Sequence, residues 1–79
     1  MTVEDVEEAI RAAGYHVAAD AAEVGLCVVE AHDFVGVDLL VCEATGNRLR
    51  YVDSGARARL AGVGLVVRDD GLVVDVQRD

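Results

Sequence analysis

Three segments of the chain are apolar at consecutive positions: residues 27–29, 39–41 and 65–67. Successive side chains of a β-strand point to opposite faces of the sheet, so such strands need apolar cover on both faces. The sequence offers one substantial helix, which can cover one face of a small sheet. We therefore expect the second face to pack on another sheet layer or on another chain, and a homodimer is the preferred interpretation.

The size of the chain points the same way. Its 79 residues have room for one core, so we expect a single domain over residues 1–79. Val and Ala dominate the hydrophobic residues, and aromatic bulk comes only from Tyr15, Phe34 and Tyr51. Oligomerisation is a common remedy for a core that is short of large side chains.

The first predicted element is a helix over residues 3–13, where apolar residues recur at helical spacing. Thr2 and Asp5 stand in the positions of a capping box, and Gly14 suits the left-handed residue that follows a last turn. Residues 15–19 indicate a short strand. Residues 20–25 indicate either a turn or a single helical turn, and the pattern leaves that choice open.

A hairpin is predicted from residues 26–32 and 37–44, joined by a loop over residues 33–36. Its register places Cys27 opposite Cys42.

A third strand follows a turn that has Gly46 and Asn47 at its centre, the order that a tight type II′ turn prefers. Counting from this turn places Glu43 opposite Arg50 and Cys42 opposite Tyr51. An ion pair and an apolar pair result, as expected for neighbouring antiparallel strands.

The last third of the chain predicts a short helix and a second hairpin. Ser54 is the expected N-cap, residues 56–61 the helix, and Gly62 its stop. Residues 63–68 and 72–77 then form a hairpin around Asp70-Gly71, a preferred type I′ turn. Four side chains of this hairpin are expected to share one face: Leu65, Val67, Val74 and Val76.

Together these elements predict an α+β fold. Its order is an N-terminal helix, an antiparallel β-meander, a short helix and a C-terminal β-hairpin (αβββαββ), with one extra short strand after the first helix as a variant.

The charge of the chain is strongly negative. Fifteen Asp and Glu oppose seven basic residues, all of them Arg, which gives a net charge of −8. This sign disfavours direct contact with nucleic acid or an anionic membrane and favours a basic protein partner. Solubility or adaptation to high salt is the alternative explanation. We expect a cytoplasmic protein, because Met1 leads into an acidic segment and no apolar run approaches the ~18 residues of a spanning helix.

Residues that could carry chemistry are few. Glu30, His32 and Asp33 form a weak candidate metal site near a strand end, but Asp38, a further carboxylate, points to the other face. Ser54 lies in no nucleophile motif, and the glycines form no phosphate-binding loop. We therefore expect neither catalysis nor a cofactor, and a small metal-dependent enzyme is the second alternative.

The two cysteines are interpreted as small buried hydrophobic residues. The alternative is a disulfide between Cys27 and Cys42, which the register brings together but a reducing compartment disfavours.

The acids lie mainly in the first helix, the segment after it and the last hairpin. The candidate partner-binding residues are Glu4, Glu7, Glu8, Asp20, Glu23, Asp69, Asp70 and Asp75. In small size, negative charge and absence of catalytic motifs, the whole chain resembles the inhibitors encoded by phages and mobile elements, including anti-CRISPR proteins.

This resemblance implies a protein that occupies a basic, nucleic-acid-binding surface of its partner. The predicted function is therefore a non-enzymatic acidic binding module, with a structural, assembly or dimerisation module as the first alternative.

Overall fold

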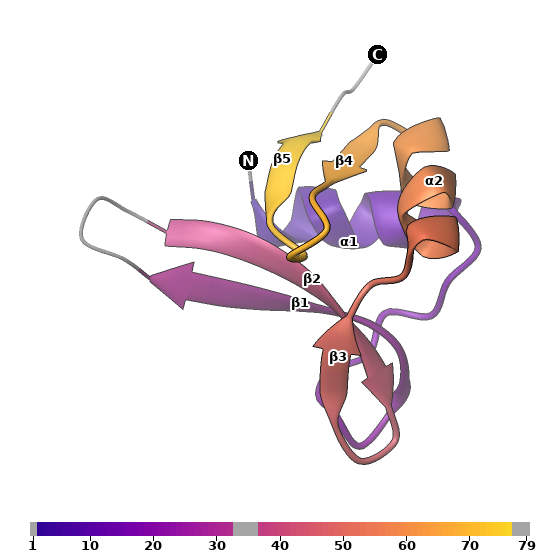
Figure 1. Ribbon diagram of the computed structural model, residues 1–79, viewed down its shortest axis with the longest axis vertical. Helices are drawn as coiled ribbons and strands as arrows, with labels where there is room; N and C mark the ends of the chain where they lie inside the picture. The colour runs from indigo at the N-terminus through magenta and orange to yellow at the C-terminus, as the bar shows by residue number, and fades with distance from the viewer. Residues whose placement is uncertain (1, 33–36, 77–79) are drawn as a thin grey trace.

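The computed structural model describes residues 2–32 and 37–76 and confirms the α+β class (Figure 1). The described strands form two antiparallel sheets, one with the order β1-β2-β3 and one that pairs β4 with β5. Neither helix of the described chain is long and apolar enough to cross a membrane. The elements, in order, are α1 (Val3–Ala12), β1 (Val24–His32), β2 (Val37–Thr45), β3 (Leu49–Tyr51), α2 (Ser54–Gly62), β4 (Leu65–Val67) and β5 (Val73–Val76).

Local sequence signals set both ends of α1. The Thr2 hydroxyl accepts a hydrogen bond from the Asp5 backbone N–H at 3.2 Å, and the Asp5 carboxylate accepts one from the Thr2 N–H at 3.3 Å. At the other end Gly14 has a φ of +89°. The N–H of Tyr15 donates to the Ile10 carbonyl at 3.2 Å, which closes the Schellman motif. The predicted capping box and glycine stop are both confirmed.

The meander has the predicted register. Cys27 lies opposite Cys42, Glu43 opposite Arg50 and Cys42 opposite Tyr51. At the β2–β3 turn the Thr45 N–H donates to the Arg48 carbonyl at 3.0 Å, and Gly46 has the positive φ that the first central residue of a type II′ turn requires. The predicted loop over residues 33–36 lies outside the described residues.

The expected strand over residues 15–19 is reduced to a single parallel bridge between Val17 and Leu26. The Leu26 N–H donates to the His16 carbonyl at 2.9 Å, so the segment runs along the edge of β1. This approach is close: a β-carbon on Gly25 would lie 2.3 Å from the His16 carbonyl oxygen. Residues 20–23 form the turn rather than the helical alternative.

The predicted N-cap of α2 was wrong by one residue. Asp53 has extended backbone angles, and its carboxylate accepts a hydrogen bond from the Ala56 N–H at 2.8 Å. Ser54 is already the first residue of the helix. Both side chains can cap a helix, but an N-cap needs an extended backbone, which Asp53 has and the helical Ser54 has not. The helix also includes Gly62, which was expected to stop it.

The final hairpin differs from the prediction in its turn and its register. The described chain has no positive φ outside glycine, so Asp70 cannot take part in a type I′ turn. Instead Arg68 donates its N–H to the Leu72 carbonyl, which makes residues 69–71 a three-residue connection with Gly71 left-handed.

As a result, the apolar face of the β4–β5 hairpin differs from the predicted one. Val66 pairs with Asp75 but Val67 pairs with Val73, so the bulge leaves Val74 without an opposite residue. Val74 is 52% exposed and Val73 is buried, which reverses the predicted assignment.

The main core lies on one face of the three-stranded sheet, between it, the two helices and the β4–β5 hairpin. Helix α1 contacts β1, β4 and β5, and the hairpin is joined to β2 by a bond from the Val41 N–H to the Gly71 carbonyl at 2.8 Å. The central side chains are Val6, Ile10, Leu26, Leu39, Val41, Val52, Leu60 and Leu65. The helices and the second sheet therefore cover the same face, so the expected arrangement, with a helix on one face and a second layer on the other, is not found within the described chain.

The opposite face of the same sheet carries a second row of apolar side chains, which we call the open sheet face. Ala18 packs against Cys27 and Ala44 at one end of it. Farther along, Leu49 and Tyr51 are 40% and 70% exposed. By strand alternation the open sheet face comprises Val29, Leu40, Cys42, Leu49 and Tyr51.

Candidate functional site

Four of the eight predicted partner-binding residues lie on two elements that touch. Glu4, Glu7 and Glu8 project from α1, Asp75 lies on β5, and the two elements are in contact (Figure 1). Glu7 is half-buried, and the other three side chains are exposed. We call these four residues the acidic surface. Glu4, Glu7 and Asp75 form no hydrogen bond or ion pair with another residue of the described chain, so their charge faces outward uncompensated.

Two further candidates, Asp20 and Glu23, stabilise the loop after α1. The Asp20 carboxylate accepts the Ala22 N–H at 2.8 Å. Glu23 accepts the Ala19 N–H at 2.9 Å and contacts His16 Nε2 at 3.2 Å. The hydrogen bond from Ala19, and then that from His16, lowers the pKa of Glu23. These carboxylates therefore have an internal structural role.

Carboxylates of the loop and of α1 both act on the Cys27 thiol. Burial is the main cause of its raised pKa, and the charges of Asp20, Glu7 and Glu23 add to it. Those three carboxylates come from two separate elements and act on one thiol.

Asp69 and Asp70 lie in the connection between β4 and β5. The Leu72 N–H donates to Asp70 at 3.0 Å, and Arg68 forms an ion pair with the same carboxylate. The backbone hydrogen bond is the larger cause of the lowered pKa of Asp70. Asp70 is a turn residue, whereas Asp69 is exposed and is not bonded to another described residue.

Four of the seven Arg lie close together in the sequence, in and beside β3 and in α2. Arg48, Arg50, Arg57 and Arg59 fall within twelve residues whose single acid is Asp53. Arg50 forms an ion pair with Glu43 at 2.6 Å across the β2–β3 ladder. The Arg59 guanidinium stacks on the Tyr15 ring at 4.7 Å and donates to the Ala13 carbonyl at 3.0 Å.

The result is a locally positive segment that the sequence prediction missed. The net charge of residues 48–59 could have revealed it, because four Arg and one Asp make that segment positive in an otherwise acidic chain. Its position on β3 and α2 separates it along the chain from the acids of α1 and β5.

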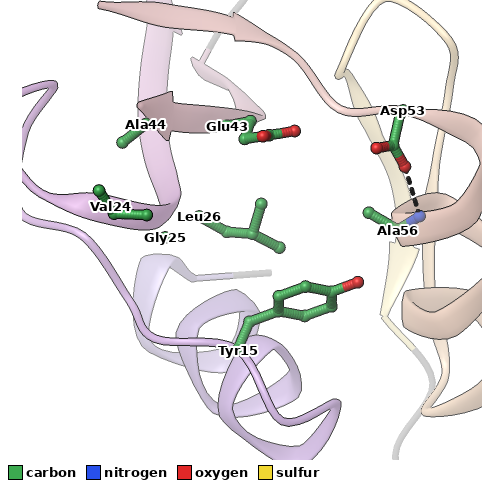
Figure 2. A pocket seen from close by; sticks show the side chains of 8 residues that line it. All are labelled: Tyr15, Val24, Gly25, Leu26, Glu43, Ala44, Asp53 and Ala56. Carbon is green, nitrogen blue, oxygen red and sulfur yellow. Dashed lines mark hydrogen bonds between the residues drawn. The ribbon is translucent and has the colours of Figure 1, made fainter. Parts of the chain in front are cut away.

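A hollow of about 240 Å³ lies where β1, β2 and the start of α2 meet (Figure 2). The Tyr15 ring projects into it beside Leu26, and its hydroxyl points toward the Asp53–Ala56 cap. The hollow is lined by Tyr15, Val24, Gly25, Leu26, Glu43, Ala44, Asp53 and Ala56.

The polar groups of the hollow are already engaged. Glu43 is bound by Arg50 and Asp53 by the Ala56 N–H. The ionisable side chains of the lining are one phenol and two carboxylates, and both carboxylates are held by these internal contacts. Its carboxylates position β3 and cap α2.

The weak metal candidate lies largely outside the described residues, so it stays a prediction. Glu30 is exposed on β1, whereas Asp33 and the side chain of His32 lie outside the described residues. Asp38 pairs with Ala31 and so lies on the opposite face from Glu30, as predicted. The described residues contain no group of three His, Cys, Asp or Glu side chains placed to hold a metal ion.

Cys27 and Cys42 are both free thiols, on neighbouring strands. Cys27 is buried and Cys42 is half-buried. Burial is the main cause of the raised pKa of each, and proximity to Cys27 adds to that of Cys42. A high pKa leaves little reactive thiolate at neutral pH, which agrees with a packing role.

Comparison with protein-family models, curated proteins and solved structures finds no match for the chain.

Proposed function

We propose that this protein is a non-enzymatic, cytoplasmic binding module that uses its acidic surface to occupy a basic surface of another protein. The observation that carries the proposal is that several acidic side chains lack the internal contacts that engage part of the basic side chains. Glu4, Glu7 and Asp75 have no hydrogen-bond or ion-pair partner in the described chain, whereas three of the seven Arg, namely Arg50, Arg59 and Arg68, are engaged by internal contacts. The uncompensated negative charge is therefore available to a partner.

Electrostatic complementarity acts mainly on the rate and specificity of such binding. Carboxylates presented by a helix and an adjoining strand can occupy Arg and Lys side chains that otherwise hold phosphates. The partner is accordingly a nucleic-acid-binding protein, and binding inhibits it by competition, as in the anti-CRISPR proteins that the chain resembles.

The experiment is affinity capture from a lysate of the source cell, with a Glu4→Arg/Glu7→Arg double variant as the comparison. The wild-type chain is expected to retain a nucleic-acid-binding protein, and added duplex DNA or RNA should release it. Charge reversal should weaken the measured affinity by about tenfold or more, and added salt should weaken wild-type binding steeply.

Asp38→Arg combined with Glu30→Arg is the matched control, because both exposed side chains lie on the β1–β2 hairpin outside the acidic surface and the change in net charge is equal. An equal loss of affinity in both double variants would show that net charge, and not the acidic surface, is responsible. Undiminished capture by the Glu4/Glu7 variant would contradict the proposal directly.

A structural or assembly role is the second candidate, and the open sheet face favours it. Leu49 and Tyr51 expose apolar area next to half-buried Cys42, and such surfaces often mark sites of association. The two roles use different surfaces, so evidence for one does not exclude the other.

A further inference from the structure

Strand β3 is an edge of the three-stranded sheet, and its backbone polarity can be read from the register. Thr45 and Arg48 form a hydrogen-bonded pair across the turn, with 3.0 Å between the Thr45 nitrogen and the Arg48 oxygen. Hydrogen-bonded and non-hydrogen-bonded pairs alternate along an antiparallel ladder, so Arg50 bonds to Glu43 on β2. Leu49 and Tyr51 therefore direct their N–H and carbonyl groups outward.

We propose that β3 is the interface for a second copy of this chain, and that the two strands pair antiparallel about a two-fold axis at Arg50. In this register Leu49 of each copy faces Tyr51 of the other. The four outward N–H groups of the two copies then donate to their four outward carbonyl groups. The two three-stranded sheets become one six-stranded sheet. An unpaired edge is a template for such strand addition, and a two-fold interface requires the same patch on both subunits.

The side chains around β3 fit a second copy. Leu49 and Tyr51 lie on the open sheet face, so each Leu49–Tyr51 pair across the axis joins the two apolar faces into one. Arg48 of each copy comes to the end of β3 where Asp53 of the other copy lies. Arg48 has no ion-pair partner within the described chain, and Asp53 is exposed, so this register supplies two complementary charge pairs.

The one unfavourable pair in this register is compensated. Arg50 faces its own copy across the axis, and like charges in that position destabilise a strand pair. Each Arg50 is already bound to its own Glu43 at 2.6 Å, which neutralises the charge at the centre of the interface. Three residues make a short edge, so the dimer is weak and reversible.

The first test is sedimentation equilibrium of the wild-type chain from about 5 μM to about 500 μM, in low and in moderate salt. We expect the mass to rise from one chain toward two, and more readily in moderate salt, because salt screens the repulsion between two acidic copies. The mass of a single chain at every concentration would overturn the proposal.

Substitution identifies the surface. Leu49→Lys should weaken dimerisation by about tenfold or more, because a charge on an edge strand opposes further pairing. Val66→Lys is the matched control, since both side chains are 40% exposed and the charge change is identical. It should leave the dimer within about twofold of wild type. Equal effects of the two substitutions would refute pairing through β3.

The register has its own test. Arg50→Cys places a thiol against its own copy at the axis, so oxidised glutathione should convert this variant to a disulfide-linked dimer. Arg48→Cys faces Val52 of the other copy and should cross-link much more slowly, as should wild type with its raised-pKa thiols. Cross-linking at position 48 as fast as at position 50 would exclude this register.

Salt separates this proposal from the proposed function. Binding of a basic partner weakens as salt rises, whereas dimerisation through β3 strengthens, and the Leu49→Lys variant retains the acidic surface. Failure of either experiment therefore leaves the other informative.

Discussion

Val41 donates its backbone N–H to the carbonyl oxygen of Gly71 at 2.8 Å, and a β-carbon on Gly71 would lie 2.8 Å from the carbonyl oxygen of Val41. This contact joins the C-terminal hairpin to the central strand of the first sheet. The space and the backbone angle, a φ of +84°, both require glycine.

Gly71→Ala should lower the free energy of unfolding by about 2 kcal/mol or more, because the left-handed conformation alone costs a residue with a β-carbon 1–2 kcal/mol. Urea denaturation monitored by circular dichroism measures the loss. Gly62→Ala is the matched control, since its β-carbon would meet nothing within 4 Å and it lies in α2. That substitution should raise the free energy of unfolding by up to about 1 kcal/mol. Equal effects at the two positions would contradict the contact.

Capping of α2 by Asp53 gives the second prediction. Asp53→Ala should cost about 1 kcal/mol, because it removes the acceptor for the Ala56 N–H. Ser54→Ala should change stability by less than about 0.5 kcal/mol, since Ser54 is within the helix. The same denaturation experiment decides between them. A larger loss of stability for the Ser54 variant would show that Ser54, as the sequence pattern predicted, is the N-cap.

The lowered pKa of Glu23 gives a prediction about pH. A carboxyl group with a lower pKa in the folded state stabilises the fold above its unfolded pKa, near 4.5, and loses that contribution as pH falls through the folded value. Wild type should therefore lose stability below about pH 4.5, and Glu23→Gln should lose less over the same range. Urea midpoints at pH 6 and pH 3.5 measure the difference. Asp38→Asn serves as the control, and a pH dependence that Glu23→Gln leaves unchanged would exclude this role.

Much of the fold follows from short-range signals. Thr2 with Asp5 and Gly14 predicted the ends of α1, because capping bonds join residues that are three to five positions apart. Gly46 predicted the β2–β3 turn, and counting from it placed Glu43 opposite Arg50. These interactions close within a few residues, so the local sequence is sufficient to specify them.

The candidate site was predictable only in part. The acids of α1 and β5 could be named, but the contact between these two elements depends on packing between the two ends of the chain. The internal roles of Glu23 and Asp70 arise from backbone N–H groups that a sequence pattern does not position. The Arg-rich β3 and α2 could have been recognised from local charge.

The sequence by itself determined the caps of α1, the register of the β1–β2 and β2–β3 hairpins and the α+β class, because these rest largely on bonds between near neighbours. Only the tertiary structure decided that Val73 and not Val74 is buried, that Asp53 and not Ser54 caps α2, and that one sheet face stays open. For the hairpin, the physical reason is that Gly71 contacts Val41 while β5 packs on α1. That long-range constraint selects the bulge, and local propensity alone could not.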